Sequence, residues 1–165
     1  MDYILDSNVF IQANRLHYSP DFCPAFWQWL LRENKAGKVF SIDMVRDEIM
    51  VGGDNLSDWA KASGKGFFLE PDEKMLPALR KVSQWASGQN YESAAVSTFL
   101  QLADYYLVAH ALATGRTVVT HEQASTSTKK IKIPDACIGL KVKFMTPYQM
   151  LRIEKAKFEL GPAGA

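Results

Sequence analysis

Tyr3-Ile4-Leu5-Asp6-Ser7-Asn8-Val9-Phe10, residues 3–10, is the stretch that decides the fold predicted from this sequence. Three apolar residues in a row are typical of a short buried strand, and the Asp, Ser and Asn that follow favour turns and helix N-caps. We therefore expect a strand at 3–5, a helix from about Val9, and a carboxylate, Asp6, at the junction between them.

Strand and helix patterns alternate along the rest of the chain. Further strands are predicted at 38–42, 67–69, 117–120 and 142–145. Helices are predicted at 22–35 (with Phe22 on the apolar face), 43–50, 58–62, 72–85 and 92–113, the last as one helix or two, and from Pro147 onward. Residues 122–135 are polar and rich in Lys, Ser and Thr, so we expect a loop there. The alternation predicts βαβ units, and so an α/β fold with a mainly parallel sheet covered on both faces.

The composition is that of one ordinary globular domain. The chain has 165 residues, 47% of them hydrophobic and 22% charged, and no repeat or linker divides it. We expect a single domain over residues 1–160, with 161–165 as a frayed C-terminal tail. The formal net charge is +1, so any surface that binds nucleic acid must be local.

Two features bear on the cellular compartment. The two cysteines, Cys23 and Cys137, exclude a disulfide-rich scaffold and a CxxC redox or zinc motif. The N-terminus lacks the basic region of a signal peptide, and the most apolar stretch, 105–113, is too short to cross a bilayer. We expect a cytoplasmic protein with no membrane partner.

Two carboxylates follow predicted strands. Asp6 comes directly after the first strand, and Glu122 lies one residue beyond the strand at 117–120. Because functional groups of open parallel sheets gather beyond the carboxyl ends of the strands, both are expected at one edge of the sheet. Taken alone, each of them is more often a helix cap or a solvated loop charge than a functional group.

Two more carboxylates lie on predicted helices. Val45, Glu48 and Ile49 have the spacing of one helical face, which places Glu48 inward and Asp47 outward. Asp104 falls on an apolar helical stripe, with no basic residue three or four positions away. Because an isolated buried carboxylate is unfavourable, Asp104 must be paired with a distant cation, neutralised or metal-bound.

Four carboxylates on four separate elements suggest an acidic pocket. Converging carboxylates repel one another, and a divalent cation relieves that repulsion; all-oxygen ligands favour Mg²⁺ or Mn²⁺. Such an ion activates water and stabilises the charge on a phosphodiester under attack. The residues therefore point to metal-assisted phosphodiester hydrolysis.

Four motifs make the chain resemble the PIN-domain family, small α/β nucleases that include the VapC-type toxins of bacterial toxin–antitoxin pairs. In family order they are Ile4-Leu5-Asp6-Ser7-Asn8-Val9-Phe10, Val45-Arg46-Asp47-Glu48-Ile49, Ala103-Asp104-Tyr105-Tyr106-Leu107-Val108-Ala109 and Val118-Val119-Thr120-His121-Glu122. The first and third are fairly specific as a pair, and the span covers most of the chain. More narrowly, the chain resembles a PIN subgroup catalogued as a domain of unknown function, with a Trp-rich first helical region.

The resemblance implies a PIN-like three-layer α/β/α fold and a metal-dependent endoribonuclease, the toxin of a toxin–antitoxin pair. It implies that Asp6, Glu48 and Asp104 bind Mg²⁺ or Mn²⁺ together with a fourth acid. The residues expected to orient them by hydrogen bonds are Ser7, Asn8 and Thr120. The resemblance also implies RNA as substrate, a cognate antitoxin protein as partner, and a homodimer as one oligomeric state.

The fourth motif departs from the family pattern. PIN proteins often have Thr followed by Asn or Asp there, whereas this chain has Thr120-His121-Glu122. Glu122 is the preferred fourth acid because it follows the strand directly. Asp135 is the alternative, and it requires the polar loop to fold back.

Contacts to the substrate require cations and aromatic rings. The candidates are Arg46, Lys129, Lys130 and His121. The two lysines equally fit a solvated loop, and His121 fits a general acid, a metal ligand or a histidine with no role; His17 and His110 are excluded from the site. The four tryptophans fit base stacking, a partner interface or the core; they are Trp27, Trp29, Trp59 and Trp85.

Two other functions compete with the nuclease. A PIN fold that binds RNA or a protein without cutting is disfavoured by the three retained acids, but the altered fourth motif leaves it open. A phosphotransferase of the haloacid-dehalogenase type also has Asp after its first strand. That chemistry requires a second Asp two residues on, where this chain has Asn8.

Overall fold

The computed structural model describes residues 1–162 and contains a central five-stranded sheet. The strand order is β3-β2-β1-β4-β5 and every pairing is parallel, with Tyr3 opposite both Val39 and Thr117. The strands are β1 (Tyr3–Leu5), β2 (Val39–Ile42), β3 (Phe68–Leu69), β4 (Thr117–Val119) and β5 (Phe144–Met145). The α/β prediction with a parallel sheet is confirmed.

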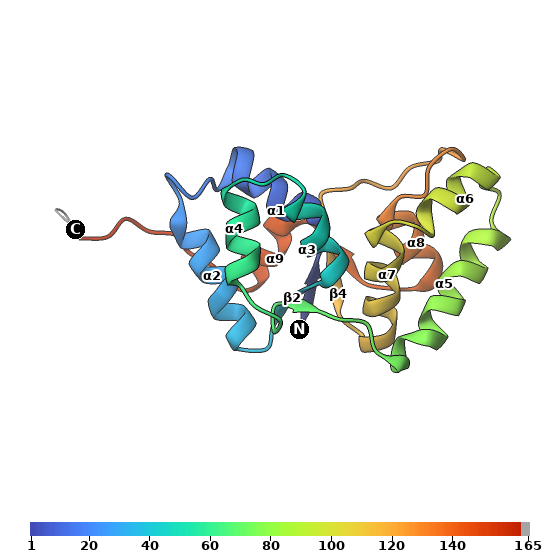
Figure 1. The fold of residues 1–165 in the computed structure, drawn as a ribbon, viewed down its shortest axis with the longest axis horizontal. Coiled ribbons are helices and arrows are strands. Elements are labelled where there is room, and N and C mark those ends of the chain that lie inside the picture. The colour runs from blue at the N-terminus through green and yellow to red at the C-terminus, as the bar shows by residue number, and fades with distance from the viewer. Residues whose placement is uncertain (163–165) are drawn as a thin grey trace.

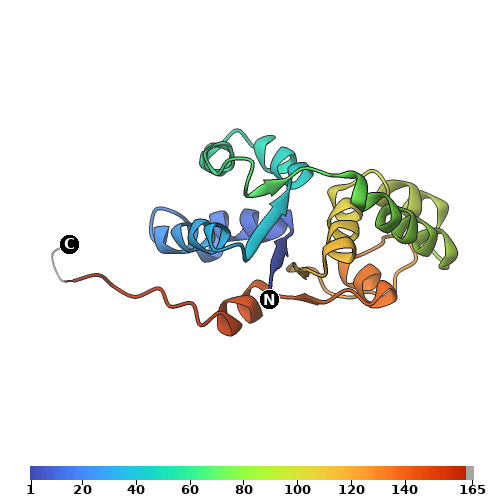
Figure 2. The ribbon, with the colours of Figure 1, turned by 90° about the horizontal axis from the view of Figure 1, so that it is seen from below.

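Helices cover both faces of this sheet, which gives a three-layer α/β/α arrangement. The α-helices are α1 (Ser7–Gln12), α2 (Pro24–Lys35), α3 (Asp43–Met50), α4 (Asn55–Ala62), α5 (Leu76–Gly88), α6 (Ser93–Phe99), α7 (Ala103–Thr114), α8 (Ile133–Leu140) and α9 (Pro147–Ile153), with a π-helix η1 (Ala13–His17) and a 3₁₀ turn η2 (Glu73–Met75). Figure 1 shows α5, α6, α7 and α8 together on one side of the sheet, and α1, α2, α4 and α9 on the other. Figure 2 shows the same division from below.

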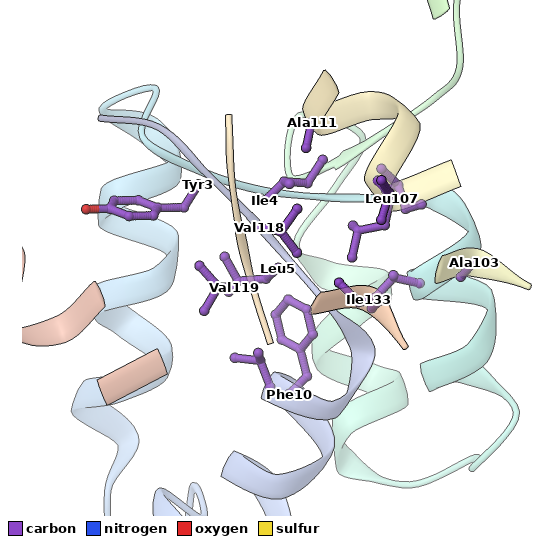
Figure 3. Packing of buried hydrophobic residues seen from close by; sticks show 14 of the residues in the cluster. Tyr3, Ile4, Leu5, Phe10, Ala103, Leu107, Ala111, Val118, Val119 and Ile133 are labelled. Atoms are coloured by element: carbon purple, nitrogen blue, oxygen red, sulfur yellow. The ribbon is translucent and has the colours of Figure 1, made fainter. Parts of the chain in front are cut away.

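One continuous core lies on the two faces of the central strand β1, whose residues are fully buried. Successive side chains of a strand point to opposite faces, so β1 contributes to both layers. Figure 3 shows Ile4 and Val118 beside Leu107 of α7, and Val119 beside Phe10 of α1. The core therefore holds the helices α1 and α7 in place against the same two strands.

The first helical region differs from the prediction. Helix α1 begins at Ser7 with Asp6 as its N-cap, not at Val9, and continues as the π-helix η1 to His17. Helix α2 begins at Pro24, because Pro is favoured in the first turn of a helix, where its missing N–H removes no hydrogen bond. Phe22 therefore precedes the helix and is 65% exposed, so the prediction that it lies on a buried face is wrong.

The second half of the chain contains one element that the sequence did not predict. Residues 133–135, expected in a loop, begin α8, and the last strand covers only Phe144–Met145. The predicted helix at 92–113 is two helices, α6 and α7, broken after Phe99.

The termini and the helix lengths complete the description. No helix within the described residues combines the length and apolar character needed to cross a bilayer. Gly161 and Pro162 are exposed and outside any helix or strand, and residues 163–165 of the predicted frayed tail lie outside the described part of the chain.

Candidate active site

Asp6 is held at the carboxyl end of β1 by hydrogen bonds to both carboxylate oxygens. Its side chain is 4% exposed. The backbone N–H of Ser7 donates to Oδ1 over 2.7 Å, and the hydroxyl of Thr120 donates to Oδ2 over 2.8 Å. The predicted orienting role of Ser7 and Thr120 therefore has a direct geometric counterpart.

The hydroxyl of Thr120 connects three parts of this edge of the sheet. Besides donating to Asp6, it accepts from Asn8 Nδ2 over 3.2 Å and from the backbone N–H of Glu122 over 3.0 Å. Asn8 Oδ1 in turn accepts from the backbone N–H of His121 over 3.2 Å. Asn8 is thus linked to Asp6 through Thr120, and these hydrogen bonds connect the end of β4 to the start of α1.

Glu122 and Asp135, the two candidates for the fourth acid, point to different places. Glu122 Oε2 accepts from the backbone N–H of Ile133, the first residue of α8, over 2.8 Å. Asp135 accepts from the backbone N–H of Ser125 over 3.0 Å, and its charge acts on Tyr91. The charge of Glu122 instead acts on Asp6 and Asp104, so Glu122 belongs to the acidic site.

Asp104 and Glu48 approach the site from α7 and α3. Asp104 is half-buried in the first turn of α7. Glu48 is exposed, as is Asp47, so the prediction that Glu48 points inward is wrong; the buried face of α3 consists of Val45 and Ile49. The charge of Glu48 nevertheless reaches Asp104.

The pKa values of the two more buried carboxyls show that the four acids share one electrostatic environment. Burial and, next, the charges of Asp104 and Glu122 together raise the pKa of Asp6 to about 7, against the hydrogen bonds from Thr120 and Ser7. Burial and, next, the charges of Glu122 and Glu48 likewise raise the pKa of Asp104 to about 6, with Lys130 opposing the rise. A negative charge on either residue is therefore poorly compensated by the protein.

The donor set fits a hard divalent cation in its chemistry. It consists of carboxylate oxygens that repel one another, which is the environment that Mg²⁺ and Mn²⁺ prefer. In the conformation of residues 1–162, no three His, Cys, Asp or Glu side chains are grouped closely enough to hold one ion. Asp6 is fixed by its hydrogen bonds, whereas Glu48 is exposed on α3.

Residues 3–158, nearly the whole chain, match the model of the family described as "Domain of unknown function (DUF4411)". The chain belongs to this family. The DUF4411 chain has no match among curated proteins or among solved structures. The family description names no activity and no link to PIN-domain nucleases, so a function for this DUF4411 protein depends on its own site.

The predicted substrate-binding residues of the DUF4411 chain differ in their position relative to the acidic site. Lys130 lies close enough to Asp104 for its charge to lower the pKa of that carboxyl, and both Lys129 and Lys130 are exposed. Arg46 Nη2 lies 3.4 Å from Asp47 Oδ1, in an ion pair on the outside of α3.

The four tryptophans differ in burial. Trp27 and Trp29 are buried in the core. Trp59 is half-buried and packs against Trp27 with ring centroids 5.0 Å apart, and Trp85 packs against Tyr91 at 5.9 Å. The core interpretation is confirmed for Trp27 and Trp29. Trp59 and Trp85 pack against the core at its edge, and Trp27 and Trp59 line an apolar pocket.

Sequence reasoning missed an aromatic group beside the acids. His17, which was excluded from the site, forms a cluster with His121 and with Tyr148 of α9. Tyr148 had no signal of its own, because it follows Pro147 in a helix start that is explained fully by capping.

Proposed function

We propose that this DUF4411 protein is a metal-dependent endoribonuclease of the PIN type, which hydrolyses phosphodiester bonds of RNA. The observation that supports this best is the set of four carboxylates from β1, α3, α7 and the end of β4, two of which have pKa values raised to about 7 and 6 by burial and by neighbouring carboxylates of the set. Carboxyls whose charge is this poorly compensated are typical of functional sites.

Four carboxylates would hold the ion: Asp6, Glu48, Asp104 and Glu122. When bound, Mg²⁺ or Mn²⁺ supplies an activated water and stabilises the charge on the phosphate. Thr120 and Ser7 keep Asp6 in one orientation, since each donates a hydrogen bond to one of its oxygens.

Cations around the carboxylates would bind the RNA backbone. Lys130, whose charge lowers the pKa of Asp104, is the first choice for a phosphate contact, with Lys129 beside it in the same exposed loop. Arg46 and His121 are further candidates. Because water and not a ribose hydroxyl attacks in this chemistry, the products would carry a 5′-phosphate and a 3′-hydroxyl.

The proposed activity has consequences for partners. A free ribonuclease damages the RNA of its own cell, so we propose that the protein is the toxin of a toxin–antitoxin pair. Its antitoxin would cover the acidic site. A cytoplasmic location and a homodimer belong to the same proposal.

The test is cleavage of a mixed pool of structured RNAs in Mg²⁺ or Mn²⁺. Wild type should cut, Asp104→Asn should not, and the control Asp21→Asn, which removes an exposed carboxylate outside the site, should cut like wild type. Equal residual cutting by wild type and Asp104→Asn would indicate a contaminating nuclease. No cutting and no metal binding by a folded protein would favour the alternative function, a PIN-fold module that binds RNA or a protein without cleavage.

A further inference from the structure

Three ring side chains from distant parts of the chain form a compact cluster. His17 ends η1, His121 follows β4, and Tyr148 lies in the first turn of α9. The ring centroids are 5.7 Å apart for His17 and His121, and 5.6 Å for each of these two with Tyr148. Tyr148 Oη and His17 Nε2 are 2.9 Å apart and share a hydrogen bond. We call these three residues the ring cluster.

A shallow groove continues from the ring cluster along α9. It has a volume of about 200 Å³, and Tyr148 belongs to both the groove and the cluster; the groove is lined by Tyr18, Tyr148, Leu151, Arg152, Ala156 and Phe158. Tyr18 is fixed by a stacked contact with Phe26, with centroids 4.6 Å apart. Since pockets for drug-sized ligands start at about 300 Å³, this groove suits a single ring system.

The ring cluster adjoins the acidic site through the backbone. His121 lies between Thr120 and Glu122, and its backbone N–H donates to Asn8, whose amide donates to Thr120. Thr120 is bonded directly to Asp6. The ring cluster and the acidic site are therefore joined through residues 120–122, at the carboxyl end of β4.

We propose that the ring cluster and its groove bind an unpaired base of single-stranded RNA, next to the phosphate that is cut. The inference rests on the proposed function and specifies its substrate class. Bases of single strands stack on Tyr and His rings, whereas the bases of a duplex are already stacked and are not available to such a surface. The exposed Arg152 at the groove provides a cation for the adjacent phosphate.

The experiment measures binding without cleavage. The full chain carrying Asp104→Asn is titrated into a fluorescently labelled single-stranded ten-nucleotide RNA and into the same sequence as a blunt duplex. Tyr148→Leu in this background should weaken single-strand binding about tenfold, the scale of one lost base stack. Tyr148→Phe, which keeps the ring, and Phe22→Leu, which removes an exposed ring elsewhere, should change Kd less than about twofold, since neither removes the stack.

The inference would be overturned if the Asp104→Asn chain did not bind the single strand, or if it bound the duplex more tightly. It would also be overturned if Tyr148→Leu had the same Kd as its parent, or if Tyr148→Phe lost as much affinity as Tyr148→Leu. Thermal melting verifies the fold of each variant, and His17→Ala, on a different element, should weaken binding in the same direction. Cleavage by the wild type is measured separately. If the wild type cuts RNA but Tyr148→Leu does not weaken binding, the proposed function stands and only this inference fails.

Discussion

The two sides of the acidic site are built in different ways. On the β1 side, Asp6 is bonded to Ser7 and Thr120, and Thr120 is bonded to Asn8 and Glu122. On the α7 side, Asp104 is positioned by the packing of α7 against α5, α8 and β4. The charges that act on Asp104 are those of Glu122, Glu48 and Lys130.

The two carboxylates are therefore positioned by different interactions, Asp6 by hydrogen bonds and Asp104 by helix packing. Hydrogen bonds with defined donors hold Asp6 in one orientation, so a lost donor affects the site directly. Packing determines where α7 lies but leaves the Asp104 carboxylate free to adjust. The following predictions test this comparison by disturbing each side in turn.

The largest effect is expected from Thr120→Val, which removes the donor to Asp6 and the acceptor for Asn8 and Glu122. Cleavage should fall by about 100-fold, the upper range for removing a residue that orients a metal ligand. The control is Thr117→Val, the same change at a buried position of the same strand. Steady-state cleavage rates of the two variants measure the difference, and similar losses in both would contradict a specific role for Thr120.

Asp6→Asn should stabilise the metal-free protein at alkaline pH. The folded pKa of Asp6 is raised to about 7 from 3.8, so the folded state favours the protonated acid. Its contribution to stability is complete at low pH and is lost as the pH rises through about 7. At pH 8 the variant should exceed wild type by about 4 kcal/mol in free energy of unfolding, and the two should converge below about pH 4.

Chemical denaturation at several pH values measures this difference. Adding Mg²⁺ at pH 8 should raise the midpoint of wild type more than that of Asp6→Asn, because a bound ion compensates the charge. A wild type more stable than the variant at pH 8 without metal would show that the Asp6 charge is compensated by the protein itself.

Gly139→Ala tests the packed side. A Cβ at this position would lie 2.1 Å from Nε1 of Trp85, so the ring must move and the contact of α5 with α8 must open. We expect a loss of about 2 kcal/mol in free energy of unfolding. The control Gly88→Ala, where a Cβ meets open space, should be neutral or slightly stabilising. Thermal melts compare the two, and a matched pair of melting curves would contradict the close contact.

The smallest effect concerns His110 in the interior of α7. Burial and, next, the charge of Arg116 together lower its pKa to about 4, so the folded state favours the neutral ring. Its contribution to stability is present above the usual pKa of 6.5 and is lost as the pH falls toward 4. Between pH 7 and pH 4.5, the free energy of unfolding of His110→Gln should therefore fall by about 1 kcal/mol less than that of wild type. If the free energies of unfolding of the two proteins change equally with pH over that range, His110 does not have this role.

The hydrogen-bonded side of the site could be predicted from sequence, because its signals are local. Asp6 follows an apolar run directly, Thr120 ends a β-branched run, and Glu122 lies two positions after it. Once the strands are parallel, topology alone brings these residues to one edge. The raised pKa of Asp104 similarly matches its position on an apolar stripe.

The packed side could not be predicted to the same degree. Glu48 precedes the buried Ile49 by one residue and so lies about 100° away around the helix, outside its buried face. Helix α8 contains Pro134 and Gly139, which favour a loop by propensity, yet Gly139 is the residue that lets Trp85 approach. His17 and Tyr148 are 131 positions apart, and only the fold brings them together.

The central place of β1 in the sheet has a consequence for biosynthesis. Its first residue pairs with both Val39 and Thr117, and Asp6 bonds to Thr120, 114 positions later in the chain. On the ribosome, the β1–β4 pair cannot form until β4 has emerged from the exit tunnel, when most of the chain has been translated. The acidic site is thus assembled only near the end of synthesis, and a nuclease built in this way would spare the message that encodes it until its own translation is almost over.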